Sequence, residues 1–299
     1  MFKAKESASY DGAAAEYGRQ IERLAGPLAT EVCRLAEIVP AWHVLDVGCG
    51  TGVVARRAAV LVGARGRVVG VDISDGMLDE ARRASGAAIE SGVLRYQRMD
   101  AECLELDDGS FDTVVSLCAV LHFPRLETAL AEMRRVLRPG GTLVVGFGTG
   151  RPIGPRTVAA YAMRRALVKI RMRGRPAVRG PGLLLRLSSE ELPEPEAPVF
   201  TTWPATRGPL APLVEALRAA GFLGIRTSWV GHEVRYESAA DLWAAQTAIV
   251  TEVRARIVGA DAALVERLRQ RFDTEVERVL ARGGTLVYPY GAALVCARS

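Results

Sequence analysis

The stretch Val44-Leu45-Asp46-Val47-Gly48-Cys49-Gly50-Thr51-Gly52 decides the fold of this chain. Its first half is a short apolar run, which is typical of a buried parallel strand, and a helical apolar pattern begins at Val53. Between them, three glycines in five positions permit backbone angles and a close ligand approach that a Cβ atom would block. A strand, a glycine turn and a helix N-terminus bring free amide groups to one point. The stretch therefore predicts a binding site built from backbone.

The residues of this turn indicate a ligand without phosphate groups. The glycine spacing is GxGxG rather than GxGxxG, no charged residue lies between Val47 and Val54, and no G-x-x-x-x-G-K-[ST] phosphate loop occurs. Asp46, at the end of the strand, would repel a pyrophosphate but suits a ligand with an ammonium or sulfonium group. Taken alone, the pattern also fits another doubly wound nucleotide-binding fold.

Asp46 and the GxGxG turn resemble the first motif of the class I S-adenosylmethionine-dependent methyltransferases, in which an acidic residue precedes the glycines. Further matches follow in order up to the string RPGGTLVV at 138–145, and the set is more specific than any one of them. The resemblance is to the small-molecule, ubiquinone/menaquinone-methyltransferase-like type. It covers residues 10–148 well and 209–230 loosely. It implies an α/β fold with a Rossmann-like, seven-stranded, mostly parallel sheet, its last strand antiparallel, and helices on both faces.

Acidic residues follow the next two predicted strands. Asp72 lies 20 residues after the last glycine of the turn, where doubly wound folds place the carboxylate that binds both ribose hydroxyls. An aspartate after a strand is often only a helix cap, but Ser74 and Asp75 are also available as caps here. Asp100 follows the third strand, and the resemblance implies that it accepts a hydrogen bond from the adenine amino group. A plain turn residue is the alternative for Asp100.

The resemblance implies S-adenosylmethionine as the cofactor, held at the carboxyl ends of the strands. The Ala101 amide would face the adenine ring, and Leu117 would offer its backbone carbonyl to the methionine amino group. Met77 would lie near the adenine, although a methionine in a first helical turn is more often a core residue. The residues predicted to bind the cofactor are Tyr17, Asp46, Gly48, Cys49, Gly50, Asp72, Ile73, Met77, Asp100, Ala101, Leu117 and Cys118.

The catalytic prediction rests on one histidine. Methyl transfer from a sulfonium is an in-line displacement, for which alignment can supply roughly 7–11 kcal/mol. A general base adds about 10²–10⁴-fold, so a site without an obvious base is credible. His122, after the fourth strand, is the best base for a phenol or hydroxyl proton, or it packs or caps the next helix. The family often has a His-His or similar polar pair there, and Leu121-His122-Phe123 departs from it, which weakens the case for a proton relay.

The predicted substrate site combines the N-terminus with the end of the chain. Residues 12–37 carry a helical pattern, and Tyr10 and Tyr17 resemble the Tyr-rich element that lies over the cofactor in many small-molecule methyltransferases. The alternative is that these tyrosines simply pack. Residues predicted to bind the substrate are Tyr10, His122, His232, Tyr288 and Tyr290.

Two insertions are expected to interrupt the second half of the sheet. We expect the cofactor-binding core to comprise residues 1–150, 209–236 and 284–299. Residues 151–208 and 237–283 would form an inserted helical cap or lid over the carboxyl ends of the strands, where ligands bind in open α/β sheets. Within the first insertion no core-like helix is expected before residues 210–221, and the chain should end with two short strands around Pro289-Tyr290-Gly291.

The positive charge of the chain is concentrated in one segment. The net charge is +5, yet residues 151–180 hold nine basic residues and no acid, so the remainder is net acidic. This segment fits a solvated lid, a clamp for an anionic substrate such as a diphosphate, or a nucleic-acid patch. Against nucleic acid, no Asn/Asp-Pro-Pro-Tyr run follows the fourth strand and few aromatic residues interleave with the arginines. The favoured partner is a small molecule.

Composition sets the remaining bounds. An apolar content of 49% is ample for a packed core, and no apolar run approaches the ~20 residues needed to span a bilayer. The N-terminus lacks the hydrophobic block of a signal peptide, which predicts a cytoplasmic protein. Five cysteines without CxxC spacing argue against a metal site. Only three of the 39 basic residues are Lys, which suggests a GC-rich bacterial genome. The oligomeric state is left open.

These observations predict an enzyme, an S-adenosylmethionine-dependent methyltransferase that acts on oxygen or carbon of a small, largely apolar molecule in natural product biosynthesis. A methyltransferase for RNA or for an anionic, diphosphate-bearing substrate, which would use residues 151–180, is a second possibility. An NAD(P)-binding oxidoreductase would have GxGxxG and often Tyr-x-x-x-Lys, but Tyr161 is followed by Arg165. The sequence also fits a methyltransferase-like fold that catalyses a cyclisation, or a non-enzymatic module that kept the cofactor fold.

Overall fold

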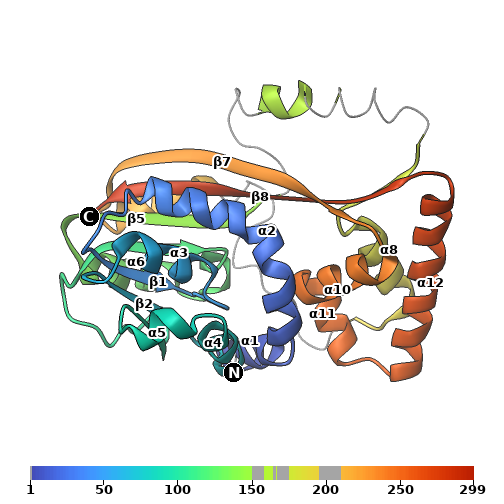
Figure 1. Cartoon of the computed structure of the whole chain (residues 1–299), viewed down its shortest axis with the longest axis horizontal. Helices are drawn as coiled ribbons and strands as arrows, with labels where there is room; N and C mark the ends of the chain where they lie inside the picture. The colour runs from blue at the N-terminus through green and yellow to red at the C-terminus, as the bar shows by residue number, and fades with distance from the viewer. Residues whose placement is uncertain (1, 150–157, 164–165, 167–174, 195–209) are drawn as a thin grey trace.

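The computed structural model describes residues 2–149, 158–163, 166, 175–194 and 210–299. A twisted sheet runs through the molecule, with helices packed on both of its faces (Figure 1). Its strands are β1 (His43–Val47), β2 (Arg67–Asp72), β3 (Leu94–Arg98), β4 (Phe111–Leu117), β5 (Leu137–Gly148), β6 (Ala177–Arg179), β7 (Leu223–Tyr236) and β8 (Thr285–Arg298). The described helices are α1 (Phe2–Asp11), α2 (Ala14–Leu35), α3 (Val53–Val62), α4 (Asp75–Arg83), α5 (Gly86–Glu90), η1 (Val120–His122), α6 (Leu126–Val136), α8 (Gly182–Glu191), α9 (Leu210–Ala219), α10 (Ala239–Ile249), α11 (Thr251–Val258) and α12 (Ala262–Ala281).

The order of the strands confirms the predicted Rossmann-like sheet. The order β3-β2-β1-β4-β5-β8 places the first five strands parallel to one another, and β8 is antiparallel to β5. β7 pairs with the other edge of β8, again antiparallel. The short β6, which was not predicted, pairs with the N-terminal end of β8. Since β1 to β5 are parallel, their carboxyl ends meet at one edge of the sheet.

Alternating side chains of the strands build one apolar layer on each face of the sheet. In β1, Val44 packs with α2 and α3, whereas Leu45 and Val47 pack with α6 and α9 on the opposite face. All three side chains are fully buried. Near-continuous apolar strands are expected where helices cover both faces of a parallel sheet.

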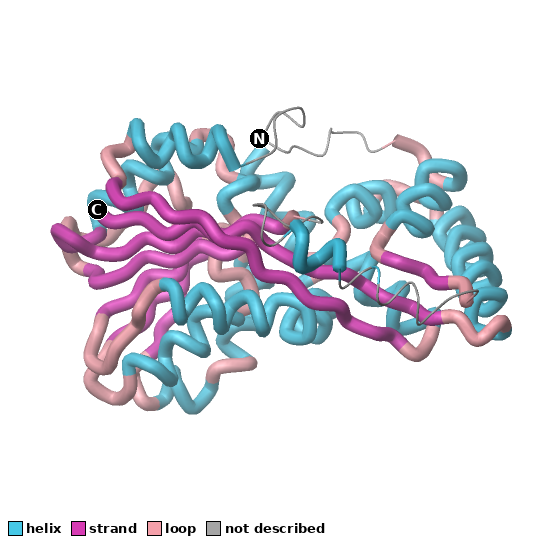
Figure 2. Tube along the Cα trace, turned by 90° about the horizontal axis from the view of Figure 1, so that it is seen from above, coloured by secondary structure: helices cyan, strands magenta, loops and turns pink. Residues whose placement is uncertain are grey.

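β7 and β8 form one long ribbon that leaves the sheet and enters a second group of helices (Figure 2). The pairing runs without interruption from Thr227↔Val295 to Tyr236↔Leu286. Two strands were predicted in place of β8, because Pro289 interrupts the apolar pattern. Pro289 lies between the stretches that pair with β6 and β5, so β8 has one strand neighbour there among the described residues. A strand tolerates proline where one of its edges is not paired.

The helices differ from the expected ones in three places. α1 precedes α2 as a separate helix. The apolar pattern over 238–258 predicts a single helix, but the structure divides this region at Val250, whose backbone is extended. Ser238 caps α10, because its side chain accepts a hydrogen bond from the Asp241 amide. Helix α8 was not expected, yet Leu184 and Leu187 on it are buried.

The second group of helices has an apolar cluster of its own. α8, α10 and α12 pack around the N-terminal half of β8, with Leu242, Phe272 and Leu286 among the buried residues. The assignment of residues 151–208 and 237–283 to a substrate cap stays a prediction, and much of the basic segment 151–180 lies outside the described residues. Within the described part of the chain, no helix is long and apolar enough to cross a bilayer.

Candidate cofactor and acceptor site

The turn between β1 and α3 needs its glycines. Gly48, Gly50 and Gly52 have φ values of 67°, 51° and 78°, a region that side chains with a Cβ atom rarely adopt. A Cβ atom on Gly48 would collide with the Cβ atom of Ala119, and one on Gly52 would collide with the hydroxyl of Tyr96. At Gly50 the same atom would meet no heavy atom within 4 Å. Protein atoms therefore pack against the turn at Gly48 and Gly52, whereas the space beside Gly50 is free of protein atoms. A ligand that binds to backbone amides requires such a space.

Asp46 is buried beneath this turn. Its side chain is 1% exposed, and its Oδ2 accepts a hydrogen bond from the Ala55 amide in the first turn of α3 at 3.0 Å. Burial raises the pKa of Asp46 to about 7, although the Ala55 amide opposes this change. The carboxyl group thus supports the helix N-terminus and lines the cavity above it.

Asp72 joins two elements at the strand ends. Its Oδ2 accepts a hydrogen bond from the Gly50 amide at 2.8 Å, and its Oδ1 accepts one from the Ser74 amide at 3.0 Å. Burial raises the pKa of Asp72 against these hydrogen bonds. Ser74, not Asp72, caps α4, because its Oγ accepts from the Met77 amide at 3.1 Å. A carboxylate offers about four lone-pair sites, so about two remain for a ligand.

Helix α1 lines the cavity beside Asp100, where an ion pair holds the helix in place. Lys3 Nζ lies 2.5 Å from Asp100 Oδ2 and 2.5 Å from Glu102 Oε2. Asp100 Oδ1 also accepts from the Glu102 amide at 3.0 Å. Burial works against ionisation of Asp100, but the hydrogen bonds from Lys3 and from the Glu102 amide outweigh it, and the pKa is lowered. Asp100 is therefore a carboxylate with one oxygen engaged by α1.

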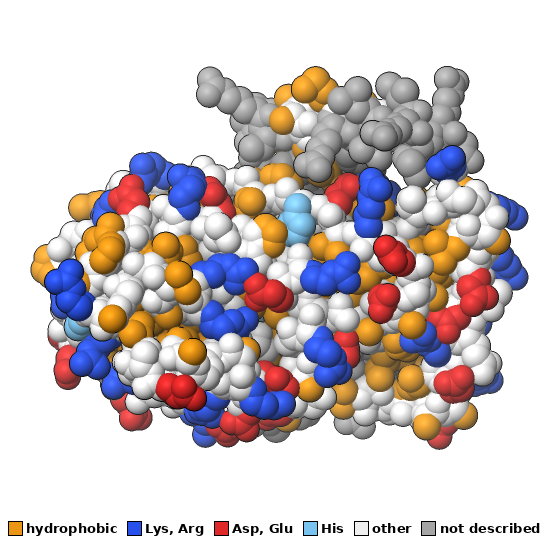
Figure 3. Space-filling view, viewed as in Figure 1, with side chains coloured by type: hydrophobic (Ala, Val, Ile, Leu, Met, Phe, Trp, Pro, Cys, Tyr) orange, Lys and Arg blue, Asp and Glu red, His pale blue; other side chains and the backbone are white. Residues whose placement is uncertain are grey.

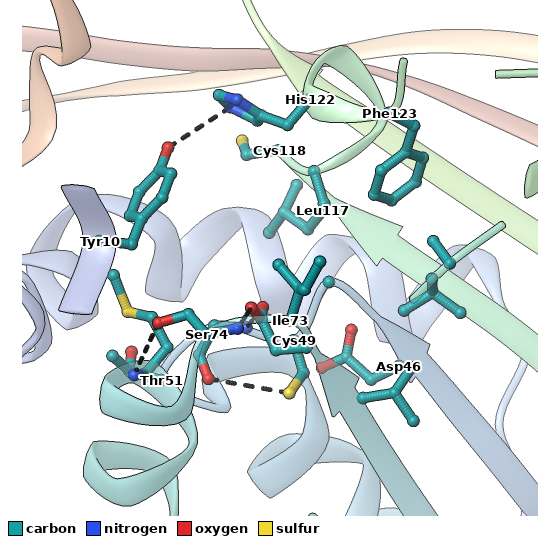
Figure 4. A pocket seen from close by; sticks show the side chains of 18 of the residues that line it. Tyr10, Asp46, Cys49, Thr51, Ile73, Ser74, Leu117, Cys118, His122 and Phe123 are labelled. Atoms are coloured by element: carbon teal, nitrogen blue, oxygen red, sulfur yellow. Dashed lines mark hydrogen bonds between the residues drawn. The ribbon is translucent and has the colours of Figure 1, made fainter. Parts of the chain in front are cut away.

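A group of polar aromatic side chains closes the opposite end (Figure 4). The Tyr10 hydroxyl points at His122, with 3.4 Å between its oxygen and Nε2. The Tyr10 ring meets the Tyr17 ring edge to face, with centroids 6.1 Å apart. Cys118 Sγ lies 3.8 Å from the Tyr290 hydroxyl, and Cys118 itself has a φ of 60°. Segments far apart in the sequence thus bring these side chains to one place.

Electrostatics distinguishes His122 from its neighbours. Burial raises the pKa of Tyr17, of Cys118 and of Tyr290, so all three are neutral at neutral pH. Neutral phenols donate hydrogen bonds but do not remove protons. Among the described residues at this end of the cavity, His122 is the one whose side chain carries an imidazole ring, and a neutral imidazole has one acceptor nitrogen.

One cavity collects most of the predicted site residues. All twelve residues predicted to bind the cofactor line it, and so do Tyr10, His122 and Tyr290. The roles of these residues stay predictions, but the structure shows that the residues lie together around one cavity.

His232 and Tyr288 do not line this cavity. His232 lies on β7, with Nε2 3.2 Å from the Arg23 carbonyl oxygen. Tyr288 is buried among the apolar residues around α12, and burial raises its pKa to about 12. Both were predicted to bind the substrate because the end of the chain was expected to face the ligand. In the structure they lie on β7 and β8, outside the cavity.

Several lining residues were missed from the sequence. Lys3 and Ser7 reach the cavity from α1, and Glu102 and Phe123 reach it from the loops after β3 and β4. No motif marks α1, since its residues show no strong apolar period. For Glu102, the Asp-Ala-Glu order beside Asp100 is a signal in the sequence that marks its position.

Comparison with known proteins finds methyltransferases that are similar to this chain. The family described as "Methyltransferase domain" matches residues 45–145. Nocamycin O-methyltransferase of Saccharothrix syringae is 30% identical over 234 residues, which cover 77% of this chain and 74% of that protein. O-methyltransferase resE of Aspergillus sclerotiorum is 37% identical over 103 residues, which cover 34% of this chain and 38% of that protein. The matched part thus spans well under half the length of the latter relative.

The solved structures give the same fold. The [4+2]-cyclase SpnF superposes with a TM-score of 0.51 at 20% identity, over 92% of this chain and 80% of that one. At this identity the likeness concerns the fold and leaves the reaction open.

Proposed function

Because this chain belongs to the class I S-adenosylmethionine-dependent methyltransferases, with S-adenosylmethionine as cofactor, we propose that it methylates a small, largely apolar molecule. One observation carries the proposal. The cavity is continuous from the carboxylates of Asp72 and Asp100 to the side chains of Tyr10, His122 and Tyr290. A methyl donor bound at one end of the cavity and an acceptor bound at the other would therefore be in contact within the same cavity.

The charges in this cavity fit a cationic nucleoside. Asp72, Asp100 and Glu102 line it, and Lys3 is already paired with two of them. Such a lining attracts a sulfonium group and repels a pyrophosphate, because like charges at short range disfavour each other. The arrangement therefore supports S-adenosylmethionine over a dinucleotide.

We assign the cofactor contacts by position. The remaining lone pairs of Asp72 would accept from the ribose hydroxyls, and the Gly50 region would face the amino acid portion. Asp100 would accept from the adenine amino group at the end where Lys3 now binds it. The Leu117 carbonyl, at the end of β4, would take the methionine amino group.

The chain's own task in the reaction is alignment and removal of a proton. The bound cofactor supplies an electrophilic methyl group. The aromatic end of the cavity holds the acceptor and excludes water, and alignment of this kind is worth roughly 7–11 kcal/mol. His122 would accept the proton of an attacking hydroxyl on the ring nitrogen that Tyr10 does not engage. The Tyr10 hydroxyl oxygen, 3.4 Å from Nε2, would accept a hydrogen bond from the Nε2–H group and fix the orientation of the imidazole. Tyr17 and Tyr290 would stay protonated.

The lining at the acceptor end favours an apolar molecule with a hydroxyl group. Ile21, Ala25, Leu117 and Phe123 supply apolar surface to the cavity. Two relatives are named as O-methyltransferases, which favours oxygen over carbon as the acceptor atom. On the face seen in Figure 3, acidic and basic side chains of the described residues are interspersed, which offers no support for a nucleic-acid substrate.

Calorimetry and methyl transfer test this proposal together. S-adenosylmethionine should bind and NAD should not, and radioactive methyl should pass from the cofactor to members of a panel of phenols and enols. His122→Asn should bind the cofactor with parental affinity and lower kcat by about 10²–10⁴-fold. Binding of NAD alone would overturn the proposal. Conversion of an acceptor to an isomer without methyl transfer would establish a cyclisation instead.

A further inference from the structure

A buried cation lies directly behind the aromatic end of the cavity. Arg254 on α11 is 4% exposed, and its Nη1 donates a hydrogen bond to the Ala248 carbonyl at 2.7 Å. Its guanidinium carbon is 4.3 Å from the centroid of the Tyr10 ring. Burial of a charge is costly unless it is well paired, and a cation over an aromatic face recovers part of that cost.

Tyr10 transmits this contact to His122. One face of the Tyr10 ring meets Arg254, and its hydroxyl is the one that reaches Nε2 of His122 at 3.4 Å. The two rings of Tyr10 and His122 stand at 88°, with centroids 5.8 Å apart. A phenol in this position decides which imidazole nitrogen carries the proton, since a hydrogen bond to one nitrogen fixes the tautomer.

Polar contacts anchor both ends of α1, the helix that carries Tyr10. Lys3 anchors one end of the helix at Asp100. Asp11 anchors the other end, because its Oδ1 accepts from the Ser74 hydroxyl at 2.6 Å and from the Gly76 amide at 2.9 Å. The Tyr10 ring itself meets two side chains, the Tyr17 ring edge to face and the Arg254 guanidinium over its face.

We propose that Arg254 is a positioning residue, which holds the Tyr10 ring so that its hydroxyl orients His122 for proton removal. The inference rests on the proposed function, because the orientation of His122 affects turnover only if a hydroxyl group is methylated. It assigns to α11, which lies far along the chain from the methyltransferase motifs, a direct part in assembling the acceptor end. A displacement of about 1 Å in such a site can cost ~10²-fold in rate.

Three variants test the inference, one of them a control on the same helix. Arg254→Met removes the cation at similar length, and should lower kcat between about ten- and a hundredfold with little change in KM for the cofactor. Arg254→Lys keeps a cation and should restore most of the loss. Arg256→Met is the control, since Arg256 donates to the carbonyls of Leu192 and Pro193 and does not touch Tyr10. It should leave kcat unchanged.

A double variant separates positioning from general damage. In a Tyr10→Phe background, which lacks the hydroxyl, Arg254→Met should cause little further loss of kcat. An equal loss in both backgrounds would overturn the inference and give Arg254 a purely structural role. So would parental kcat in Arg254→Met.

Nuclear magnetic resonance tests the same contact without turnover. The chain has three histidines, so ¹⁵N-labelled imidazoles give few signals. Arg254→Met should shift the ring signals of His122 and leave those of His43 and His232 in place, and Arg254→Lys should shift them less. Unchanged His122 signals would refute the contact. If the parent binds cofactor but methylates nothing while this shift is seen, the proposed function fails and the coupling of Arg254 to His122 stands.

Discussion

The carboxylate of Asp72 at the tip of β2 holds the glycine turn that follows β1, through a 2.8 Å hydrogen bond from the Gly50 amide to its Oδ2. Its other oxygen accepts from the Ser74 amide at 3.0 Å, ahead of α4. The group assigned to the ribose hydroxyls is therefore also the group that shapes the backbone site. Substitutions of Asp72 should change both properties.

Asp72→Ala should weaken cofactor binding by about tenfold or more and lower the free energy of unfolding by about 1–3 kcal/mol, since two amides lose their acceptor. Asp72→Asn keeps one acceptor oxygen and should lose less stability while still weakening binding. Titration calorimetry and chemical denaturation of both variants measure the two effects. Parental cofactor affinity in Asp72→Ala would remove Asp72 from the ribose role.

The stability of the ligand-free protein should fall as the pH rises because of Asp46. Its pKa is about 7 in the folded protein against 3.8 for an ordinary aspartate, so the folded state holds the proton more tightly. The associated stability is complete below pH 3.8 and is lost as the pH rises through about 7. Asp46→Asn does not titrate, so its stability relative to the parent should rise over this window by about 4 kcal/mol at most.

Denaturation at several pH values checks this expectation. The exposed Asp79, replaced by Asn, is the control and should keep the pH dependence of the parent. A stability difference between Asp46→Asn and the parent that does not change with pH would show that Asp46 stays ionised in the folded protein.

Substitutions in the glycine turn should affect the stability of the protein and its affinity for the cofactor to different extents. Gly52→Ala places a Cβ atom against the Tyr96 hydroxyl, which is buried and lies 3.0 Å from the Ser85 hydroxyl, so the turn must shift and stability should fall by about 3 kcal/mol or more. Gly50→Ala meets no protein atom and should cost about 1–2 kcal/mol for its φ alone. It should still weaken cofactor binding. Equal losses of stability in the two variants would contradict this account.

The cofactor half of the site was predictable because it is local. Asp46 and Asp72 lie at the ends of β1 and β2, and Asp100 lies just after β3. The carboxyl ends of parallel strands meet at one edge of the sheet, whatever the rest of the chain does. A motif of a few residues therefore fixes both the backbone shape and the neighbours of each side chain.

The acceptor half depends on contacts between distant segments. Lys3 reaches Asp100 and Arg254 reaches Tyr10 only after α1 has packed against α4 and α11, and nothing in the sequence near these residues states that packing. The position of His232 and Tyr288 outside this cavity has the same cause. Both residues lie on the long β7–β8 ribbon, which extends beyond the cavity. The sequence did not indicate the length of this ribbon, because Pro289 interrupts the apolar pattern of β8.

That ribbon has a mechanical consequence. β7 and β8 pass from the sheet beside the cavity to the helices around α12 as one hydrogen-bonded unit (Figure 2), so no hinge divides the two parts along it. Rotation of one part against the other would break ladder bonds. The wall formed by α1 is held by the side chains of Lys3, Ser7, Tyr10 and Asp11 and, among the described residues, by no strand pairing. We therefore expect spent cofactor to be exchanged for fresh cofactor by loosening of that helix, a movement that leaves the sheet intact.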